Sequence, residues 1–339
     1  MKKSFLLAAA FLGMLLLASC SNDEKCYVKS SVDSSSEDYS SKTIEDLEKY
    51  NKVLVHNFSA TRGVGSGSNR RKARIVAADL NGAVESLDEH HNLTSIALGL
   101  IFGGHPHAGG ALLAAIAAKG AVPASWNAYK KTCGLAYKTE EIESLFGRTK
   151  NYCLESMVLE DNMAYADIDD DISSCIDIPD SLNFLLRAGV AHNQIINLHR
   201  QNDRNTEIHR TPKRIPFAPE IEFDYCMQVR EAYNSTEFEI GFFDTWGLFD
   251  EYDSSTGFDF DSYIEENPYQ SSFVTSTITL FVNALDVIPD TDSDLYDTIN
   301  SYISIIEDNN EFSRDDRYQI YAGLIVAAYS YNLWNGILN

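Results

Sequence analysis

Residues 96–118 form a run in which no side chain carries a formal charge, and this run limits what the chain can fold into. Its length is close to that of a membrane-spanning helix. Two glycine pairs, Gly103-Gly104 and Gly109-Gly110, stand on either side of Pro106 and break the run into two short halves. We therefore expect a buried helical hairpin whose small residues let the two backbones approach each other.

Conditional insertion into a membrane is the alternative for the same run. Gly99 and Gly103 have the spacing that lets apolar helices pack together in lipid. His105 and His107 have metal-like spacing, since alternate residues of an extended segment can point to one ion. No third ligand is near them in the sequence, so we favour a turn that carries two histidines. We predict no metal site and no cofactor.

Helical periodicity dominates the rest of the chain. Apolar residues recur at intervals of three and four over residues 69–89, 139–160, 181–201, 272–287 and 315–338. Asp180 is the expected cap of the third helix. We predict an all-α fold, an irregular multi-helix bundle with the Gly/Ala-rich apolar hairpin and one long aromatic and acidic loop region. The prolines within residues 211–219 mark a boundary, which favours two lobes at 43–210 and 217–339.

The N-terminus has the features of a secretory signal peptide over residues 1–19. Lys2 and Lys3 precede an apolar run, and small residues precede Cys20. The order Leu17-Ala18-Ser19-Cys20 resembles a bacterial lipobox, and the resemblance implies that Cys20 becomes the lipidated first residue. The alternative is an ordinary signal that happens to end at a cysteine. Residues 21–25 are similar to the acidic export signals of Bacteroidota lipoproteins, which implies an outer-membrane protein that faces the cell surface.

A lipidated cysteine would hold a soluble body at a membrane through a tether. Fatty-acyl chains such as palmitate contribute about 0.8 kcal/mol per buried methylene, so two or three chains anchor a protein without a spanning helix. Residues 20–42 are the expected tether, because residues 26–42 hold seven serines and few apolar side chains. The body would then begin at residue 43.

The charge distribution limits the partners of that body. The net charge is −23, and residues 231–313 hold 19 Asp and Glu but no Lys or Arg. A polyanionic surface of this kind argues against nucleic acid and anionic membrane surfaces as partners. It is compatible with a cation, a basic peptide or a neutral glycan, although acidity that only keeps an exported protein soluble is the plainer interpretation.

Residues 238–269 interleave aromatic and acidic side chains and form the best candidate ligand site. Aromatic rings stack on sugars or cationic groups, while carboxylates accept hydroxyl or ammonium protons. The candidate residues are Phe242, Phe243, Trp246, Phe249, Asp250, Tyr252 and Asp253. The alternative is an irregular loop that its aromatic residues hold against the core.

Cysteine usage is consistent with an oxidising compartment. With Cys20 acylated and Cys26 in the tether, two disulfides could join Cys133, Cys153, Cys175 and Cys226 by any of three pairings. Cys153 also lies on the apolar face of its predicted helix, so a small buried hydrophobic residue is an equal alternative there.

Catalytic signatures are missing from the sequence. It has no G-x-S-x-G, phosphate-binding or H-E-x-x-H motif. Gly189-x-x-His192-Asn193 places polar side chains on an apolar helix face, and we interpret His192 and Asn193 as a structural hydrogen-bonding hub. This element and the aromatic residues 329–334 resemble uncharacterised Bacteroidota lipoproteins and secreted proteins, for which the resemblance implies no activity.

These features favour a surface-anchored binding or interaction module without enzymatic activity. The expected partners are a membrane, through the lipid anchor, and a glycan, peptide or cation. Two alternatives are a membrane-perturbing factor that uses residues 96–118 and a hydrolase that uses His192 or His199.

Overall fold

Helices are the only regular elements in the residues that the computed structural model describes, which are 41–58, 67–136, 138–158, 170–203, 242, 260–288 and 291–338. The all-α fold class is therefore confirmed. The helices in chain order are α2 (Lys42–Phe58), α3 (Gly67–Glu89), α4 (His91–Phe102), α5 (Pro106–Thr132), α6 (Thr139–Val158), α7 (Asp170–Ser173), the 3₁₀ helix η2 (Asp180–Leu185), α8 (Leu186–Asp203), α11 (Phe260–Glu266), α12 (Ser272–Leu285), α13 (Asp292–Asn309) and α14 (Arg314–Leu338). Cys20 and the tether up to residue 40 lie outside the described residues.

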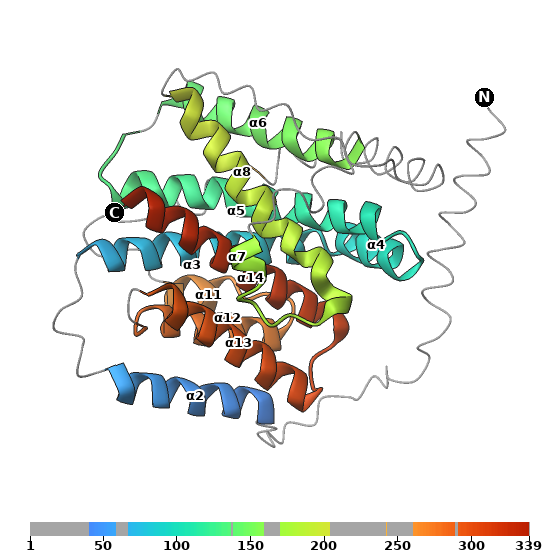
Figure 1. Ribbon diagram of the computed structural model, residues 1–339, viewed down its shortest axis with the longest axis vertical. Helices are drawn as coiled ribbons and strands as arrows, with labels where there is room; N and C mark the ends of the chain where they lie inside the picture. The colour runs from blue at the N-terminus through green and yellow to red at the C-terminus, as the bar shows by residue number, and fades with distance from the viewer. Residues whose placement is uncertain are drawn as a thin grey trace. The chain divides into compact units, whose positions relative to one another are not determined.

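Helices α3, α5, α8 and α14 form the centre of the described body, with α14 packed against both α3 and α8 (Figure 1). Every side chain of α14 from Tyr318 to Tyr331 is buried. A helix that is covered on all sides has no polar face to show in its sequence. The aromatic and small residues of α14 therefore fill the core around its whole circumference, and not only along the single apolar face that its periodicity indicates.

Glycine allows the central helices to touch backbone to backbone. A Cβ on Gly82 of α3 would lie 2.5 Å from the carbonyl oxygen of Gly120 of α5, and the reverse substitution would also clash. Ser86 is one turn further along α3 and donates a hydrogen bond to the carbonyl oxygen of Ile116 at 2.7 Å. The two helices are therefore held at a separation that only glycine permits at the crossing.

The apolar run 96–118 contains the turn of a hairpin formed by α4 and α5, at Gly104 with a φ of +92°. Gly109 of α5 lies against α4, where a Cβ would overlap the carbonyl oxygen of Ala97. The Gly99–Gly103 pair does not form a helix–helix contact, because a Cβ on Gly99 would meet no atom within 4 Å. The close approach that we expected from the small residues of the hairpin is therefore made at Gly109 and not at Gly99.

The second half of this hairpin is much longer than the run predicted. Helix α5 continues to Thr132 with Pro123 inside it. Residues 108–132 are long and apolar enough to cross a membrane, but 94% of their most apolar window is buried inside the body. A core helix of a soluble protein has this pattern, which favours the buried hairpin over the membrane-inserting alternative.

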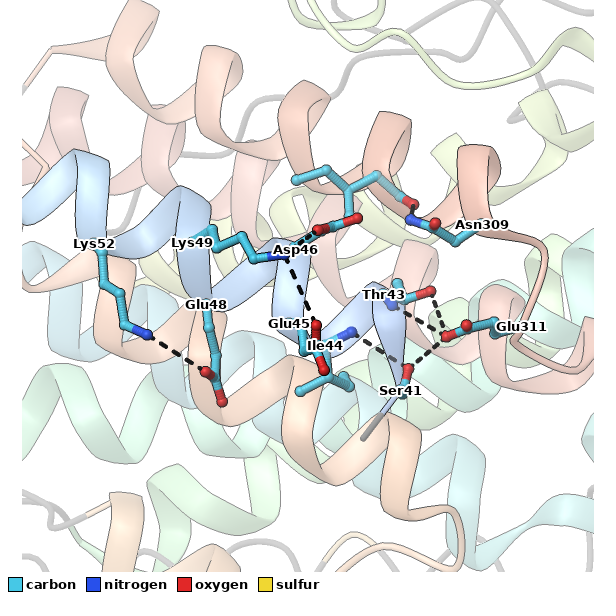
Figure 2. A network of polar contacts seen from close by, with 11 residues as sticks. Ser41, Thr43, Ile44, Glu45, Asp46, Glu48, Lys49, Lys52, Asn309 and Glu311 are labelled. Atoms are coloured by element: carbon cyan, nitrogen blue, oxygen red, sulfur yellow. Dashed lines mark hydrogen bonds and ion pairs between the residues drawn. The ribbon is translucent and has the colours of Figure 1, made fainter. Parts of the chain in front are cut away.

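The body begins at a polar clamp between α2 and the segment that follows α13 (Figure 2). Glu311 accepts hydrogen bonds from the hydroxyl of Ser41 at 2.6 Å and from the backbone nitrogen and hydroxyl of Thr43 at 3.1 and 3.0 Å. The Ser41 hydroxyl in turn accepts a hydrogen bond from the backbone nitrogen of Ile44 at 3.3 Å. Ser41 and Glu311 together therefore satisfy backbone and side-chain donors at the start of the helix.

The predicted lobe boundary within residues 211–219 lies outside the described residues. Helix α2 packs against α12 and α13, and α14 packs against α3 and α8, so helices from both proposed lobes interleave. Residues 41–339 form one compact unit. The described helices on both sides of that boundary therefore share one hydrophobic core.

Candidate functional site

Asp79 is the centre of a polar cluster that lies between the central helices. It lies on α3 and its side chain is fully buried. Its Oδ2 atom accepts hydrogen bonds from the hydroxyl of Ser330 and from the indole nitrogen of Trp334, the latter at 3.3 Å. The same indole nitrogen lies 3.3 Å from the hydroxyl of Ser125 on α5. Three helices therefore contribute polar groups to one buried carboxyl group.

His192 and Asn193 bring a fourth helix, α8, to the same point. The side-chain nitrogen of Asn193 donates to the carbonyl oxygen of Tyr329 at 2.8 Å. This bond orients the amide so that its Oδ1 atom faces Nδ1 of His192, 3.0 Å away. Because Oδ1 is an acceptor, Nδ1 of His192 carries a hydrogen. The Nε2 atom of His192 then faces Oδ2 of Asp79 at 3.5 Å.

Gly189 lets α8 come close enough for these contacts. A Cβ on Gly189 would overlap the ring of Tyr329 on α14. The helix therefore rests directly on that ring, one turn before His192 and Asn193. The two sequence elements singled out above, residues 189–193 and 329–334, thus meet in the structure through a packing contact and a hydrogen bond.

Burial controls the charge of the cluster. It raises the pKa of Asp79 from its ordinary 3.8 to about 8, although hydrogen bonds from Ser330, Ser125 and Trp334 act in the opposite direction. Burial also lowers the pKa of His192 from 6.5 to about 4, against the opposing effect of Asn193. The imidazole is enclosed by protein on all sides, so it cannot reach a substrate from solvent. This position does not suit the hydrolase alternative for His192.

His199, the other candidate base, lies in an aromatic cluster. Its ring packs edge-on against Trp126 with centroids 4.7 Å apart, and only 2% of the residue is exposed. The indole nitrogen of Trp126 donates to Glu141 at 2.9 Å, and Lys130 pairs with the same carboxylate at 2.7 Å. These contacts join α5, α6 and α8, which indicates a packing role for His199.

The aromatic and acidic candidate site is described only at its ends. Phe242 is fully buried and packs edge-on against Phe146 of α6 with centroids 5.3 Å apart. The core encloses its ring, which favours the alternative interpretation, that this aromatic residue holds its segment against the core. The other six candidates, Phe243, Trp246, Phe249, Asp250, Tyr252 and Asp253, lie outside the described residues.

The far end of that segment is attached to α3 by tyrosine hydroxyl groups. Tyr263 donates to Glu85 at 2.8 Å, and Tyr269 donates to Asn81. Gln270 adds a backbone hydrogen bond to Asp88 at 3.1 Å. Burial, with smaller contributions from the charges of Glu89 and Asp88, raises the pKa of Glu85 from 4.5 to about 7 against the opposing effect of the Tyr263 hydrogen bond. These aromatic residues hold their segment against the core, as the alternative interpretation proposed.

Among the cysteines that the structure describes, no disulfide is formed. Cys133, Cys153 and Cys175 are present as thiols, and Cys226 lies outside the described residues. Cys153 is buried, and its sulfur lies 3.8 Å from the carbonyl oxygen of Ala115 as a hydrogen-bond donor. Burial raises the pKa of this thiol to about 12. Cys153 therefore behaves as the small buried residue that its helical position also indicated.

The sequence interpretation missed Asp79, although a signal was present. Asp79 follows Val76 by three residues and precedes Ala83 by four, so it lies on the apolar face of α3. A charged residue at a core position requires a buried partner. Its partners come from α8 and α14, and no local pattern connects those helices to α3.

Within the described ranges, no group of three or more His, Cys, Asp or Glu side chains is arranged to hold a metal ion. His105 is the residue before α5, and its side chain does not cap the helix. A scan against protein-family models, a search of curated proteins and a search of solved structures each found no match.

Proposed function

We propose that this chain is a lipid-anchored interaction module of the outer membrane, exposed at the cell surface and without enzymatic activity. The observation that carries the proposal is the sequence Leu17-Ala18-Ser19-Cys20, followed by a serine-rich stretch that leads to a helical body beginning at Ser41. Acyl chains on Cys20 would anchor that body without a spanning helix. The clamp of Glu311 on Ser41 and Thr43 supports this arrangement, because it attaches the start of the body to its C-terminal half.

A binding role is favoured over catalysis by the position of the two candidate bases. His192 and His199 are 0% and 2% exposed, and both contribute to contacts between core helices. A general base must reach the proton that it abstracts. We propose a glycan, a basic peptide or a cation as the ligand, because residues 243–259 are rich in aromatic and acidic side chains and residues 231–313 are acidic in composition.

Metabolic labelling tests the anchor. Cells that express the chain are fed an alkyne analogue of palmitate, and incorporation is measured for the wild type, Cys20→Ala and Cys26→Ala. We expect Cys20→Ala to abolish labelling and to release the protein from the outer-membrane fraction, while the nearby Cys26→Ala keeps both. Equal labelling of all three chains, or none, would remove the anchor from the proposal. Digestion of the wild type by a protease added to intact cells tests surface exposure.

Binding is tested separately on the secreted, unanchored body. Glycan arrays, basic peptides and Ca²⁺-dependent melting are compared for the wild type, Trp246→Ala and the pair Asp250→Asn with Asp253→Asn. A glycan ligand depends most on Trp246, and a cation depends most on the two aspartates. Asp297→Asn is the matched control, since it removes an exposed carboxylate from α13. Binding that all variants retain would exclude this segment as the ligand site.

A further inference from the structure

Asp79 and His192 are a buried acid and base whose facing atoms are not hydrogen-bonded to each other. Nε2 of His192 lies 3.5 Å from Oδ2 of Asp79, and both side chains are 0% exposed. Oδ1 of Asp79 and Nε2 of His192 have no hydrogen-bond partner among the described residues. Buried polar atoms of this kind are rare and need a physical explanation.

The surrounding contacts decide where a proton can reside. Nδ1 of His192 keeps its hydrogen because Asn193 is oriented by the carbonyl group of Tyr329. Oδ2 of Asp79 already accepts from Ser330 and Trp334. The only variable positions are therefore the carboxyl group of Asp79 and the Nε2 atom of His192.

One proton makes this pair electrically neutral, whichever of the two residues carries it. The groups that face Asp79 from α5, α8 and α14 are Ser125, His192, Ser330 and Trp334, and of these only His192 has an acid–base side chain that can exchange a proton with a carboxyl group. Other ionisable side chains of the central helices lie in contacts of their own: Lys72 with Asn335, Lys119 with His90, and His199 with Trp126. Loss of the single proton would leave a net negative charge in the core, which is unfavourable.

We propose that Asp79 and His192 act as one proton-sharing unit that makes the packing of α3, α8 and α14 sensitive to pH near neutrality. The unit stabilises the packing of these helices while it holds one proton, and it destabilises that packing when the proton leaves. This inference is independent of the anchor and of any ligand.

The pH window follows from comparing proton binding in the folded and unfolded chains. The raised pKa of Asp79 gives stability that is fully present below 3.8 and is lost as pH rises through about 8. The lowered pKa of His192 gives stability that is present above 6.5 and is lost as pH falls through about 4. Between pH 4 and 6.5 the two contributions cancel, because the folded and unfolded chains each bind one proton.

Above pH 6.5 the two contributions no longer cancel. The unfolded chain has lost both protons, while the folded unit keeps one up to about pH 8. The folding equilibrium constant then falls tenfold per pH unit, or about 30-fold in all. The pair is therefore expected to leave the stability of the folded chain independent of pH under mildly acidic conditions and to lower that stability just above neutrality.

Urea unfolding of the full-length chain at several pH values between 4.5 and 8.5 tests the proposal. The contribution of the pair is obtained by subtracting the profile of each variant from that of the wild type. Asp79→Asn keeps the shape and the acceptor of the side chain but cannot ionise, so the 30-fold fall between pH 6.5 and 8 should disappear. His192→Gln should instead make the fall begin near pH 4. Parallel profiles for wild type and Asp79→Asn above pH 6.5 would overturn the proposal.

Nitrogen NMR of the wild-type imidazole keeps the test independent of variant folding. With ¹⁵N-labelled histidine, we expect Nδ1 of His192 to be protonated at pH 7 and its Nε2 signal to shift as Asp79 ionises near pH 8. Glu85→Gln is the matched control, since it removes the other buried carboxyl group of α3. That variant should change the unfolding profile without moving the His192 signal. A His192 signal that is constant from pH 6.5 to 8.5 would contradict a shared proton.

Discussion

Gly189 of α8 lies directly against the aromatic ring of Tyr329 on α14, with no room for a Cβ between them. This contact sets the distance at which Asn193 reaches the carbonyl oxygen of Tyr329 and His192 reaches Asp79. The polar cluster therefore depends on the absence of one methyl group. Glycine at this position is explained by packing and needs no special backbone conformation.

Gly189→Ala should destabilise the body by about 1–3 kcal/mol, because the added methyl group forces the helices apart. Denaturant unfolding monitored by far-UV circular dichroism measures the change. Gly99→Ala is the matched control, since Gly99 lies in a helix with nothing within 4 Å of its Cβ position. That control should be stabilised by about 0.5–1 kcal/mol. Equal effects at both sites would mean that the Gly189–Tyr329 contact does not limit the packing.

Glu311→Gln should loosen the first turn of α2, because the charged acceptor for Ser41 and Thr43 is lost. We expect amide hydrogen exchange at Thr43 to become about tenfold faster, the effect of losing one hydrogen bond to a charged group. These hydrogen bonds lower the pKa of Glu311 from 4.5. The stability that these hydrogen bonds contribute is therefore fully present above pH 4.5 and is lost as pH falls through the lowered pKa of Glu311.

An exposed acid elsewhere provides the control for the clamp. Asp308→Asn removes a carboxylate from the last turn of α13 and should leave the exchange rate at Thr43 unchanged. If Asp308→Asn accelerates exchange as much as Glu311→Gln does, the general negative charge of this region holds α2, and the specific hydrogen bonds do not.

Phe242→Ala should cost about 3–5 kcal/mol of stability, because it deletes a fully buried ring that packs against Phe146. The measurement is the urea midpoint of the purified variant. Phe102→Ala, at a residue that is 51% exposed, should cost much less. A small loss at Phe242 together with a large loss of ligand binding would restore this residue to the candidate ligand site.

Glu85→Gln should remove a second pH dependence of stability. Burial raises the pKa of Glu85 from 4.5 to about 7, so its contribution is full below pH 4.5 and is lost as pH rises through about 7. The variant should therefore be less sensitive to pH than the wild type between 4.5 and 7, as measured by unfolding midpoints across that range. Tyr263→Phe removes the hydroxyl that donates to Glu85 and should raise the pKa of this carboxyl further. An unchanged pH profile in Glu85→Gln would show that this carboxyl group is not protonated in the folded chain.

The helices themselves were predictable from the sequence, because a helix buried on one face repeats its apolar residues every three or four positions. The ranges 139–160 and 272–287 agree closely with α6 and α12. Periodicity was less informative for η2, which begins at Asp180 as a 3₁₀ turn with Pro179 before it, where a capped α-helix was predicted. A local pattern does not distinguish two helix types that share the same few residues.

What the sequence determined alone is the set of segments that must be helical and the burial of the uncharged run, since residues 108–118 have no polar face to give to water. Only the tertiary structure decided which glycines touch, which of the polar core residues meet, and that one unit contains both predicted lobes. The reason is that Asp79, His192 and Ser330 lie on separate helices. Their proximity depends on how those helices pack, and helical periodicity within each segment carries no information about its neighbours in space.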